Sequence, residues 1–486
     1  MHEVLFTRTA LFPYARYIMK FRYLIFGRLF PCILFALVLV GLCGALAVWL
    51  PRALAPLWAV ERLFSFLVGL TVADAALRAE GRTARFLLLL LLPWVGALVC
   101  LAKRSNTPFP APVPSKGRGI PALCKTLGGT VSFAESAEYF PVGNALRPCF
   151  LNDLSAAKKR IWLEYYIIAP GAFWGDILAI LKQKAASGVD VRLIYDDFGC
   201  AGTLPRGYER ELRRASIHAF ACNKLRLGGN INRRNHRKLA LIDGEIAYTG
   251  GINLADEYTG ETVRFGHWKD SAVRLTGGPV HALEALFAKV WNARFPGDKL
   301  SPAENEGKGD IPCAVFHDDA DGSFRRAANV FRRFIAEAKS TLYLTTPYLM
   351  PDASLADALK DAALAGVDVR LMIPHIPDKR TVFCVTRKFA RLLEKSGVKV
   401  REYTAGFLHA KNAVADGKNT VIGSYNLDLR SLYLQAECAV YLEHAPLARA
   451  VEQDFERDWE ASSPVPKATL RERFICLLLR PFSPLI

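Results

Sequence analysis

The sequence carries one charged pattern twice, with the two copies 173 positions apart. The pattern is a histidine, a lysine two positions later and an aspartate five positions after the lysine. Its members are His236, Lys238 and Asp243 in the first copy and His409, Lys411 and Asp416 in the second. Residues two apart on a β-strand point to the same side, so each His–Lys pair can address one anion. The pattern therefore predicts an anion-binding site.

A short tail follows each copy. It reads Gly250-Gly-Ile-Asn253 after the first copy and Gly423-Ser424-Tyr-Asn426 after the second. Glycine lets the backbone approach closely, and the side chains of Asn253, Ser424 and Asn426 can donate hydrogen bonds to an anion. One isolated match to the pattern is a weak signal, because His and Lys fall two apart on many surface strands. Two matches with the same tail are a strong signal. The histidines that lack this context are expected to be structural.

A longer internal duplication surrounds the two patterns. The segment Gly188-Val-Asp-Val-Arg-Leu193 returns as Gly366-Val-Asp-Val-Arg-Leu371, and each copy follows a predicted helix, over Asp176–Ala186 and Ser354–Ala365. Apolar, aromatic and β-branched runs typical of buried strands precede both helices, at 159–168 and 340–349. Strand, helix and strand in sequence predict a right-handed crossover between parallel strands.

The duplicated units are too long for the repeats of a solenoid, so we expect two domain-sized halves of an α/β protein. The first half spans 122–296 and the second spans 311–486, with the predicted joint at 297–310. A duplicated α/β unit commonly packs around a pseudo-twofold axis. Motifs repeated near such an axis can be brought face to face.

Residues 1–104 are predicted to be a membrane anchor. Leu29–Leu50 is an apolar run of 22 residues, long enough to cross a bilayer of about 30 Å, and Phe86–Ala102 is a second run of 17. Between them, Leu57–Ala73 is interrupted by two charges, so two or three membrane segments remain open. Basic residues flank the first and last runs, which favours cytosolic flanks and an even number of spans. The proline-rich stretch 105–121 is the predicted linker to the catalytic part.

The charge and the cysteine content limit which partners and which cellular compartment are possible for the chain. The chain has 63 Lys+Arg and 46 Asp+Glu, a net charge of +17, and is 51% hydrophobic. This combination points to an anionic membrane as partner, with nucleic acid as the rival interpretation. Residues 1–104 hold 12 basic and 4 acidic residues and so contribute +8 of the charge. Eleven cysteines without a CxxC pair exclude a zinc ribbon and favour buried, reduced thiols on the cytosolic side.

With its duplicated motif, the chain resembles the phospholipase D superfamily, and within it the bacterial cardiolipin synthases. The supporting segments are Tyr195-Asp-Asp-Phe-Gly199, Thr346-Pro-Tyr-Leu-Met-Pro-Asp352, Gly406-Phe-Leu-His-Ala-Lys411, Asn426-Leu-Asp-Leu-Arg-Ser431 and the closing Arg480-Pro-Phe-Ser-Pro-Leu-Ile486. Two departures are Gln435, where that family usually has Asn, and Ala169-Pro-Gly-Ala172, where it usually has an acidic stretch. The resemblance implies duplicated phospholipase D-like α-β-α domains with mixed sheets packed around a pseudo-twofold axis, preceded by N-terminal transmembrane helices.

The resemblance also implies a mechanism without a metal or another cofactor. His236 would attack phosphorus and form a phosphatidyl-histidine. His409 would protonate the leaving glycerol and then deprotonate the incoming alcohol. Lys238 and Lys411 would hold the non-bridging oxygens and offset the charge that builds on them.

Carboxylates complete the predicted site. Each histidine needs one on its other ring nitrogen to fix the tautomer. Asp270 and Glu437 stand 34 and 28 residues after their motif histidines and are the candidates. The sequence leaves open which carboxylate serves which histidine. Asp243 and Asp416, the last residues of the motifs, are expected to tie each motif to its surroundings.

The expected function is the transfer of a phosphatidyl group from one phosphatidylglycerol to another, which gives cardiolipin and glycerol. The enzyme would be a multi-pass protein of the bacterial inner membrane, with its catalytic part in the cytoplasm and no nucleic acid as partner. The apolar tail Phe474–Ile486 either lies in the membrane interface or packs on the protein's own surface. The rival functions are another phosphatidyltransferase, a hydrolase or a nuclease of the same superfamily, or a non-catalytic scaffold that binds anionic lipid.

Overall fold

The computed structural model describes residues 115, 117–225, 232–302, 309–319 and 325–479. The predicted membrane anchor at 1–104, with its two or three apolar segments, lies outside these residues. In the part of the chain that is described, no helix has both the length and the apolar character needed to cross a bilayer. The elements treated below lie in one compact unit, formed by Pro110–Asn223 and Asn232–Ile486.

The first half alternates strands and helices. Its strands are β1 (Thr130–Phe140), β2 (Arg160–Tyr165), β3 (Asp190–Asp196), β4 (His218–Cys222), β5 (Lys238–Ile242), β6 (Ile246–Gly250), β7 (His267–Lys269) and β8 (Ala272–Gly277). Its helices are α6 (Gly119–Thr126), α7 (Gly143–Ala156), α8 (Ala172–Ala186), α9 (Tyr208–Arg214), α10 (Asp256–Thr259) and α11 (Gly278–Arg294).

The second half repeats this succession. Its strands are β9 (Ile311–Asp318), β10 (Thr341–Thr345), β11 (Leu349–Met350), β12 (Asp368–Pro374), β13 (Lys399–Tyr403), β14 (Gly406–Leu408), β15 (Asn412–Ala415), β16 (Asn419–Gly423), β17 (Leu427–Asp428), β18 (Glu437–Glu443) and β19 (Ser463–Pro464). Its helices are α12 (Arg326–Glu337), α13 (Ala353–Leu364), α14 (Arg380–Glu394), α15 (Leu429–Tyr433), α16 (Ala445–Glu460) and α17 (Leu470–Leu479).

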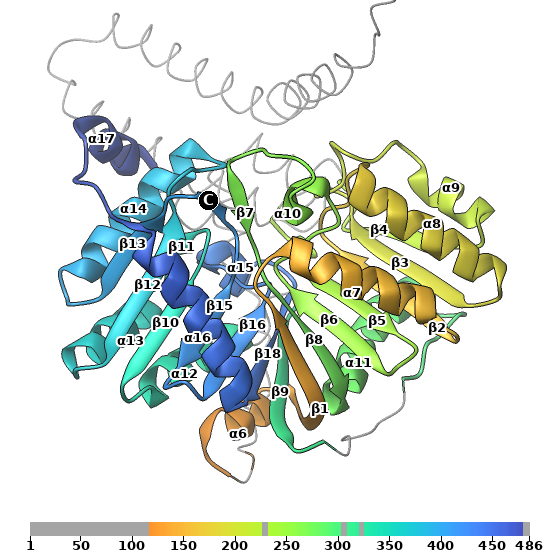
Figure 1. Ribbon diagram of the computed structural model, residues 1–486, viewed down its shortest axis with the longest axis horizontal. Coiled ribbons are helices and arrows are strands. Elements are labelled where there is room, and N and C mark those ends of the chain that lie inside the picture. Colours follow the sequence, from red (N-terminus) through yellow and green to blue (C-terminus); the bar gives the residue numbers. More distant parts are fainter. Residues whose placement is uncertain (1–114, 116, 226–231, 303–308, 320–324, 480–486) are drawn as a thin grey trace, which may run out of the picture. The chain divides into compact units, whose positions relative to one another are not determined.

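The strands of both halves join into one sheet. Among the described residues, fifteen strands form a mixed sheet in the order β19-β13-β12-β10-β15-β16-β18-β9-β1-β8-β6-β5-β2-β3-β4. The first strands of the halves, β1 and β9, pair antiparallel near its centre, and corresponding strands follow outward on both sides (Figure 1). This order is that of a pseudo-twofold axis. The expected pair of packed sheets is therefore one continuous sheet, because β1 and β9 pair with each other.

The repeated Gly-Val-Asp-Val segment leads from a helix into a parallel strand, as predicted. β2 pairs parallel with β3, and β10 pairs parallel with β12. Gly188 follows α8 and Gly366 follows α13, with φ angles of 87° and 93°. Glycine adopts this left-handed conformation without a steric penalty and therefore recurs at both helix ends.

Three buried clusters hold the helices against the sheet. One joins α7, α8 and α9 to β2 and β3, and a second joins α6, α12 and α13 to β10 and β12. The third packs α11 and α16 against strands of both halves. Alternate side chains of one strand enter different clusters, since Ile161 and Leu163 belong to the first and Trp162 to the third. Each half therefore has a helix–sheet–helix layering.

Helix α6 connects the predicted linker with the core of the second half. It begins at Gly119, so the last three residues of the predicted linker 105–121 are helical. Pro121 is accommodated because it lies in the first turn, where a backbone N–H has no partner within the helix. Ile120 and Cys124 are buried in the cluster of the second half. The start of the first half thus stabilises the second.

A buried cluster of charges also ties the halves together. Nζ of Lys269, at the end of β7, lies 2.6 Å from a carboxylate oxygen of Asp454 and 2.9 Å from one of Asp458, both on α16. Tyr139 of β1 donates a hydrogen bond to the other carboxylate oxygen of Asp454 (2.8 Å). Because Lys269 immediately precedes Asp270, this cluster fixes the segment that carries one predicted orienting carboxylate.

The C-terminal helix α17 packs on the protein's own surface. Cys476 is buried against Met350, and Glu472 forms an ion pair with Arg387 of α14 (3.1 Å). Phe474 is 61% exposed. The apolar tail was expected either to lie in the membrane interface or to pack on the protein's own surface. Its described part, as far as Cys476, packs on the protein.

Replacement of Asp454 by Asn should lower the free energy of unfolding by about 3 kcal/mol, because it leaves the buried ammonium of Lys269 with one carboxylate fewer. Chemical denaturation of the purified protein measures this loss. Asp357→Asn is the control, since Asp357 pairs with Lys360 (3.0 Å) on the exposed face of α13, and such pairs contribute less than about 1 kcal/mol. Equal losses in the two variants would contradict the importance given to the buried cluster.

Candidate active site

His236 is positioned by a contact between the two halves. Its backbone N–H donates to the carbonyl of Ala436 (2.8 Å), and the N–H of Ala436 donates to the carbonyl of Arg234 (2.8 Å). These two hydrogen bonds place Glu437, the first residue of β18, beside the imidazole of His236. The two carboxylate oxygens of Glu437 lie 2.9 and 3.0 Å from Nδ1 of His236. The carboxylate on His236 therefore comes from the other half.

His409 is held in the corresponding way. β14 pairs parallel with β7, and the N–H of His409 donates to the carbonyl of Lys269 (2.7 Å). Asp270 follows, and its Oδ2 lies 2.5 Å from Nδ1 of His409. Gly251, in the tail of the first motif, makes room for this carboxylate, because a Cβ there would lie 2.0 Å from Oδ1 of Asp270.

The two histidine–carboxylate pairs are thus crossed between the halves. Both carboxylates have 0% exposure, and a buried charge without a partner costs several kcal/mol. For each carboxylate, the histidine partner comes from the other half. In both pairs the carboxylate accepts the Nδ1 proton, which leaves the lone pair on Nε2. The crossed contacts therefore yield two imidazoles of the same tautomer in one cluster.

Lys238 and Lys411 belong to the same cluster. Both side chains are buried, and each Nζ donates to the backbone carbonyl of the histidine two residues earlier. Burial lowers the pKa of Lys238 to about 7 and that of Lys411 to about 8. The negative charges of Glu437 and Asp270 oppose this change for both lysines. Two poorly solvated ammonium groups form a strong site for an anion, because charges interact more strongly at low dielectric.

Both histidines are neutral in the resting protein. Burial, with the charges of Lys238 and Lys411, lowers the pKa of His236 well below 6.5. Burial and the charge of Lys411 lower the pKa of His409 to about 4, although Asp270 opposes the change. A neutral imidazole whose Nδ1 is bonded to a carboxylate has its Nε2 electron pair available for attack on an electrophile such as phosphorus.

Aromatic rings enclose the two imidazoles. The ring centroid of Tyr166 lies 4.7 Å from that of His236. The rings of Tyr258 and Trp268 lie 5.6 and 5.7 Å from the ring of His409. These rings keep water from the imidazoles, and this exclusion is the physical source of the effect of burial on both histidine pKa values.

The three predicted hydrogen-bond donors of the tails differ in their surroundings. Asn253 accepts from the N–H of Ile167 (3.1 Å) and donates to the hydroxyl of Tyr258 (2.6 Å). Ser424 donates to the carbonyl of Cys438 (3.2 Å) and accepts from its N–H (3.1 Å). The side-chain amide of Asn426 is buried, and its oxygen has no partner among the described residues. An amide oxygen only accepts hydrogen bonds, so an anion would have to bind the side-chain NH₂ group of Asn426.

Asp243 and Asp416 do not join the cluster. Asp243 accepts from the backbone N–H groups of Lys158, Lys159 and Arg160 (2.7–2.9 Å), where β2 begins. Asp416 accepts from the N–H groups of residues 339–341 at the start of β10. A five-residue strand such as β5 spans roughly 16 Å, so Asp243 lies at the far end from His236. The structure therefore separates the third residue of each motif from the predicted catalytic set.

Sequence reasoning did not assign two residues that contact Glu437. The hydroxyl of Ser431 donates to Oε1 of Glu437 (2.5 Å). The amide nitrogen of Gln435, in the orientation that satisfies its neighbours, donates to the same oxygen (3.2 Å). Both stand between the tail of the second motif and Glu437, and this closeness in sequence is the signal by which they could have been found.

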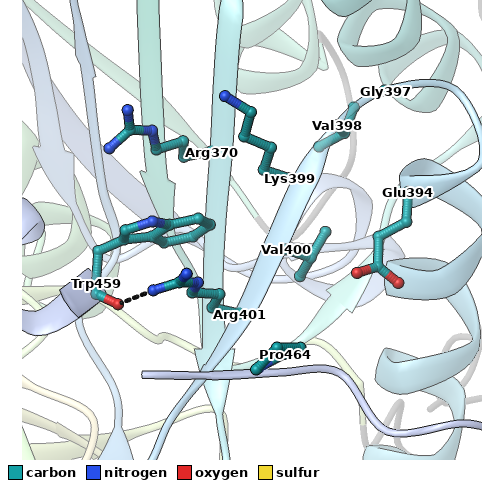
Figure 2. Close-up of a pocket in the computed structure, with 9 residues that line it drawn as sticks. All are labelled: Arg370, Glu394, Gly397, Val398, Lys399, Val400, Arg401, Trp459 and Pro464. Carbon is teal, nitrogen blue, oxygen red and sulfur yellow. Dashed lines mark hydrogen bonds between the residues drawn. The ribbon is translucent and has the colours of Figure 1, made fainter. Parts of the chain in front are cut away.

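A separate groove of about 540 Å³ lies at the outer edge of the second half (Figure 2). Basic and aromatic side chains of β12, β13 and α16 line it, among them Arg370, Lys399, Arg401 and Trp459. Arg401 donates to the carbonyl of Trp459 (2.8 Å). Arg370 and Lys399 both pair with Asp368, at 2.6 and 2.8 Å. Because its cations already have partners and no predicted site residue lines it, this groove is distinct from the histidine cluster.

Comparison with known proteins assigns the chain to a family. The family profile described as "Cardiolipin synthase, PLD-like domain" matches residues 150–291 and 331–459, together more than half of the 486 residues. The two matched segments contain both histidines and both carboxylates of the cluster. The chain belongs to this family. The resemblance expected from the duplicated motif is thereby confirmed.

Individual relatives agree with this assignment. A cardiolipin synthase of Listeria monocytogenes is 34% identical over 74% of this chain and 76% of its own length. Cardiolipin synthase 2 of Bacillus cereus is 35% identical over 75% of this chain and 73% of its own. Among solved structures, a phosphatidylserine synthase from Haemophilus influenzae Rd KW20 shares the fold, with a TM-score of 0.57 and 13% identity over 75% of this chain and 97% of that one. As a member of its family, the chain is a phosphatidyltransferase.

Asp270→Asn and Glu437→Gln should each lower kcat by roughly 10²–10⁴, because an amide N–H directed at Nδ1 selects the wrong tautomer. Phosphatidyl transfer in detergent micelles measures this loss. Asp243→Asn is the matched control and should lower the free energy of unfolding by about 1–3 kcal/mol, with little change in kcat. A loss of kcat in Asp243→Asn as large as in Asp270→Asn would contradict the separation of Asp243 from the histidines.

The pH profile of kcat/KM should reflect the shifted pKa values of the cluster. As the pH rises through about 7 and 8, Lys238 and then Lys411 lose the protons that an anionic phosphate requires, so kcat/KM should fall between about pH 7 and 9. His236 must be neutral to attack, and its pKa lies well below 6.5, so activity should persist below that pH. Rates at pH 5–9.5 in micelles of one composition test this, and an acid limb centred at 6.5 or a plateau to pH 9.5 would contradict it.

Proposed function

We propose that this chain is a membrane-anchored cardiolipin synthase that uses phosphatidylglycerol as both donor and acceptor. The observation that carries the proposal is the pair of crossed histidine–carboxylate contacts beside two buried lysines. Such a cluster offers one nucleophile and one acid–base group to a single phosphodiester. The names of the Listeria and Bacillus relatives support cardiolipin as the product.

In the first step, Nε2 of His236 attacks the phosphorus of one phosphatidylglycerol. A P–N bond forms, and the P–O bond to the terminal glycerol breaks. His409 takes up a proton from solvent on Nε2 when the anionic phosphodiester binds and gives this proton to the departing oxygen, so glycerol leaves as a neutral alcohol. Lys238 and Lys411, with the amide of Asn426, stabilise the charge on the non-bridging oxygens.

In the second step, the terminal hydroxyl of another phosphatidylglycerol gives its proton to Nε2 of His409. Its oxygen attacks the same phosphorus, and the P–N bond to His236 breaks. The products are cardiolipin, a neutral His236 and a His409 that again carries the proton on Nε2. Asp270 and Glu437 act as positioning residues throughout, because their contacts with Nδ1 direct both Nε2 atoms to the reacting phosphate.

Membrane anchoring is the second part of this proposal. Residues 1–104 would hold the enzyme in the bacterial inner membrane through two or three apolar segments, with the linker 105–121 leading to a cytoplasmic catalytic part. That part would consist of the halves 122–296 and 311–486 and their joint 297–310. The lengths of the apolar runs and their basic flanks support this arrangement.

The test is a product analysis with purified full-length protein in detergent micelles that contain phosphatidylglycerol as the only phospholipid. We expect cardiolipin and glycerol in equal amounts, measured by mass spectrometry. Phosphatidic acid without cardiolipin would instead identify a hydrolase. Absence of turnover would favour a lipid-binding scaffold.

His236→Ala should abolish turnover and the trapping of labelled lipid phosphate on the protein after an acid quench. The matched control is His375→Ala, because His375 also has a carboxylate on Nδ1 (Glu402, 2.8 Å) but lies outside the cluster. The control should keep wild-type activity. A phospho-adduct in His236→Ala would assign the nucleophile to His409.

A further inference from the structure

Two cations beside the histidine cluster have no part in the steps above. Arg430 lies in α15, and Lys379 ends the loop between β12 and α14. Neither forms an ion pair within the described part of the chain. Burial and the charges of the motif lysines lower the pKa of His236, and the charges of Arg430 and Lys379 add to that effect. Both cations therefore act on the imidazole that binds the transferred phosphate.

Arg430 is linked to the cluster by one amide. The side-chain oxygen of Gln435 accepts from Nε of Arg430 (3.1 Å), while its nitrogen donates to Glu437 (3.2 Å). Glu437 in turn holds His236. Only Nε of Arg430 is used in this chain of contacts, so its two terminal nitrogens remain available to bind an anion.

Lys379 approaches from a different segment. Its Nζ lies 5.1 Å from the ring centroid of Tyr348, whose hydroxyl donates to Asp378. Tyr348 directly precedes β11, which pairs parallel with β17, and Arg430 follows the end of β17 by two residues. Lys379 and Arg430 thus approach from adjacent elements, and an anion bound to both would offset the repulsion between their like charges.

The first half does not repeat the positive charge of Arg430. Four positions after Asn426 stands Arg430, whereas four positions after Asn253 stands Glu257. The motif lysines are present in both halves, but this extra positive charge is present in one. The electrostatic symmetry of the site is therefore broken on the side of Arg430.

The second step provides a reason for this asymmetry. An acceptor phosphatidylglycerol carries its own phosphate, which three carbons join to the attacking oxygen. Six bonds then separate the two phosphorus atoms, so they lie at most about 8 Å apart. Lys238 and Lys411 already hold the transferred phosphate, so the second phosphate needs cations of its own within that reach.

We propose that Arg430 and Lys379 bind the phosphate of the acceptor lipid and so favour an anionic lipid over a neutral alcohol as acceptor. This inference rests on the proposed function, because it concerns the second substrate of the same site. It extends that function by assigning the residues that distinguish phosphatidylglycerol from glycerol or water in the second step.

The experiment compares two reactions of one enzyme in the same micelles. One is formation of cardiolipin, and the other is exchange of labelled glycerol into phosphatidylglycerol, which uses the same donor and the same histidines with a neutral acceptor. Lys379→Gln and Arg430→Gln should each lower the ratio of cardiolipin formation to exchange roughly tenfold or more, as expected for a lost charge-assisted contact. Arg430→Lys, which keeps the charge, should restore most of the ratio.

The matched control is Lys395→Gln, at the opposite end of α14 and roughly 24 Å away along the helix. It should keep the wild-type ratio. Because exchange itself requires a folded site, a variant that still exchanges glycerol is folded. An unchanged ratio, or an equal fall of both reactions, would overturn the acceptor site. A wild-type enzyme that exchanges glycerol without forming cardiolipin would overturn the proposed function itself.

Discussion

The rest of the structure depends on two contacts, in each of which a fully buried carboxylate pairs with a histidine of the opposite half. Asp270 and Glu437 have 0% exposure, and a buried carboxylate is tolerated only beside a good partner. The antiparallel pairing of β1 with β9 and the parallel pairing of β7 with β14 set the register of the halves. The ion pairs of Lys269 reinforce that register next to Asp270. An error in it would separate both histidine–carboxylate pairs at once.

The same symmetry that duplicates the histidines does not give them equal surroundings. Glu437 shares its charge among His236, Ser431 and Gln435, and burial raises its pKa to about 7. Asp270 accepts from the N–H of the next residue and from His409. Two copies of one motif can divide the work of nucleophile and acid–base group because their environments differ, as in other sites with paired titratable residues.

Local patterns in the sequence were enough to predict the duplication, the parallel crossovers and the two His–Lys pairs. The crossed pairing was not predictable, because Asp270 and Glu437 occupy corresponding places in the two halves, so straight and crossed assignments fit the sequence equally. Tertiary register alone decides between them. Similarly, the start of α6 was predicted to be linker because Gly and Pro surround it. The helix forms there because α6 packs against α12. The separation of Asp243 from His236 follows from the length of β5, the strand that lies between them. The motif in the sequence does not by itself show this distance.

The electrostatics of the cluster couple the position of a proton to the presence of substrate. His409 must carry a proton on Nε2 in the first step, yet its pKa is lowered to about 4 in the resting protein. A phosphodiester brings a negative charge to the lysines that help to lower this pKa. At an effective dielectric constant of about 20, unit charges about 4 Å apart interact by about 4 kcal/mol, which corresponds to roughly three pKa units. A bound phosphodiester therefore raises the pKa of His409. The buried charges that keep His236 a neutral nucleophile therefore allow the substrate itself to create the condition under which His409 acts as an acid.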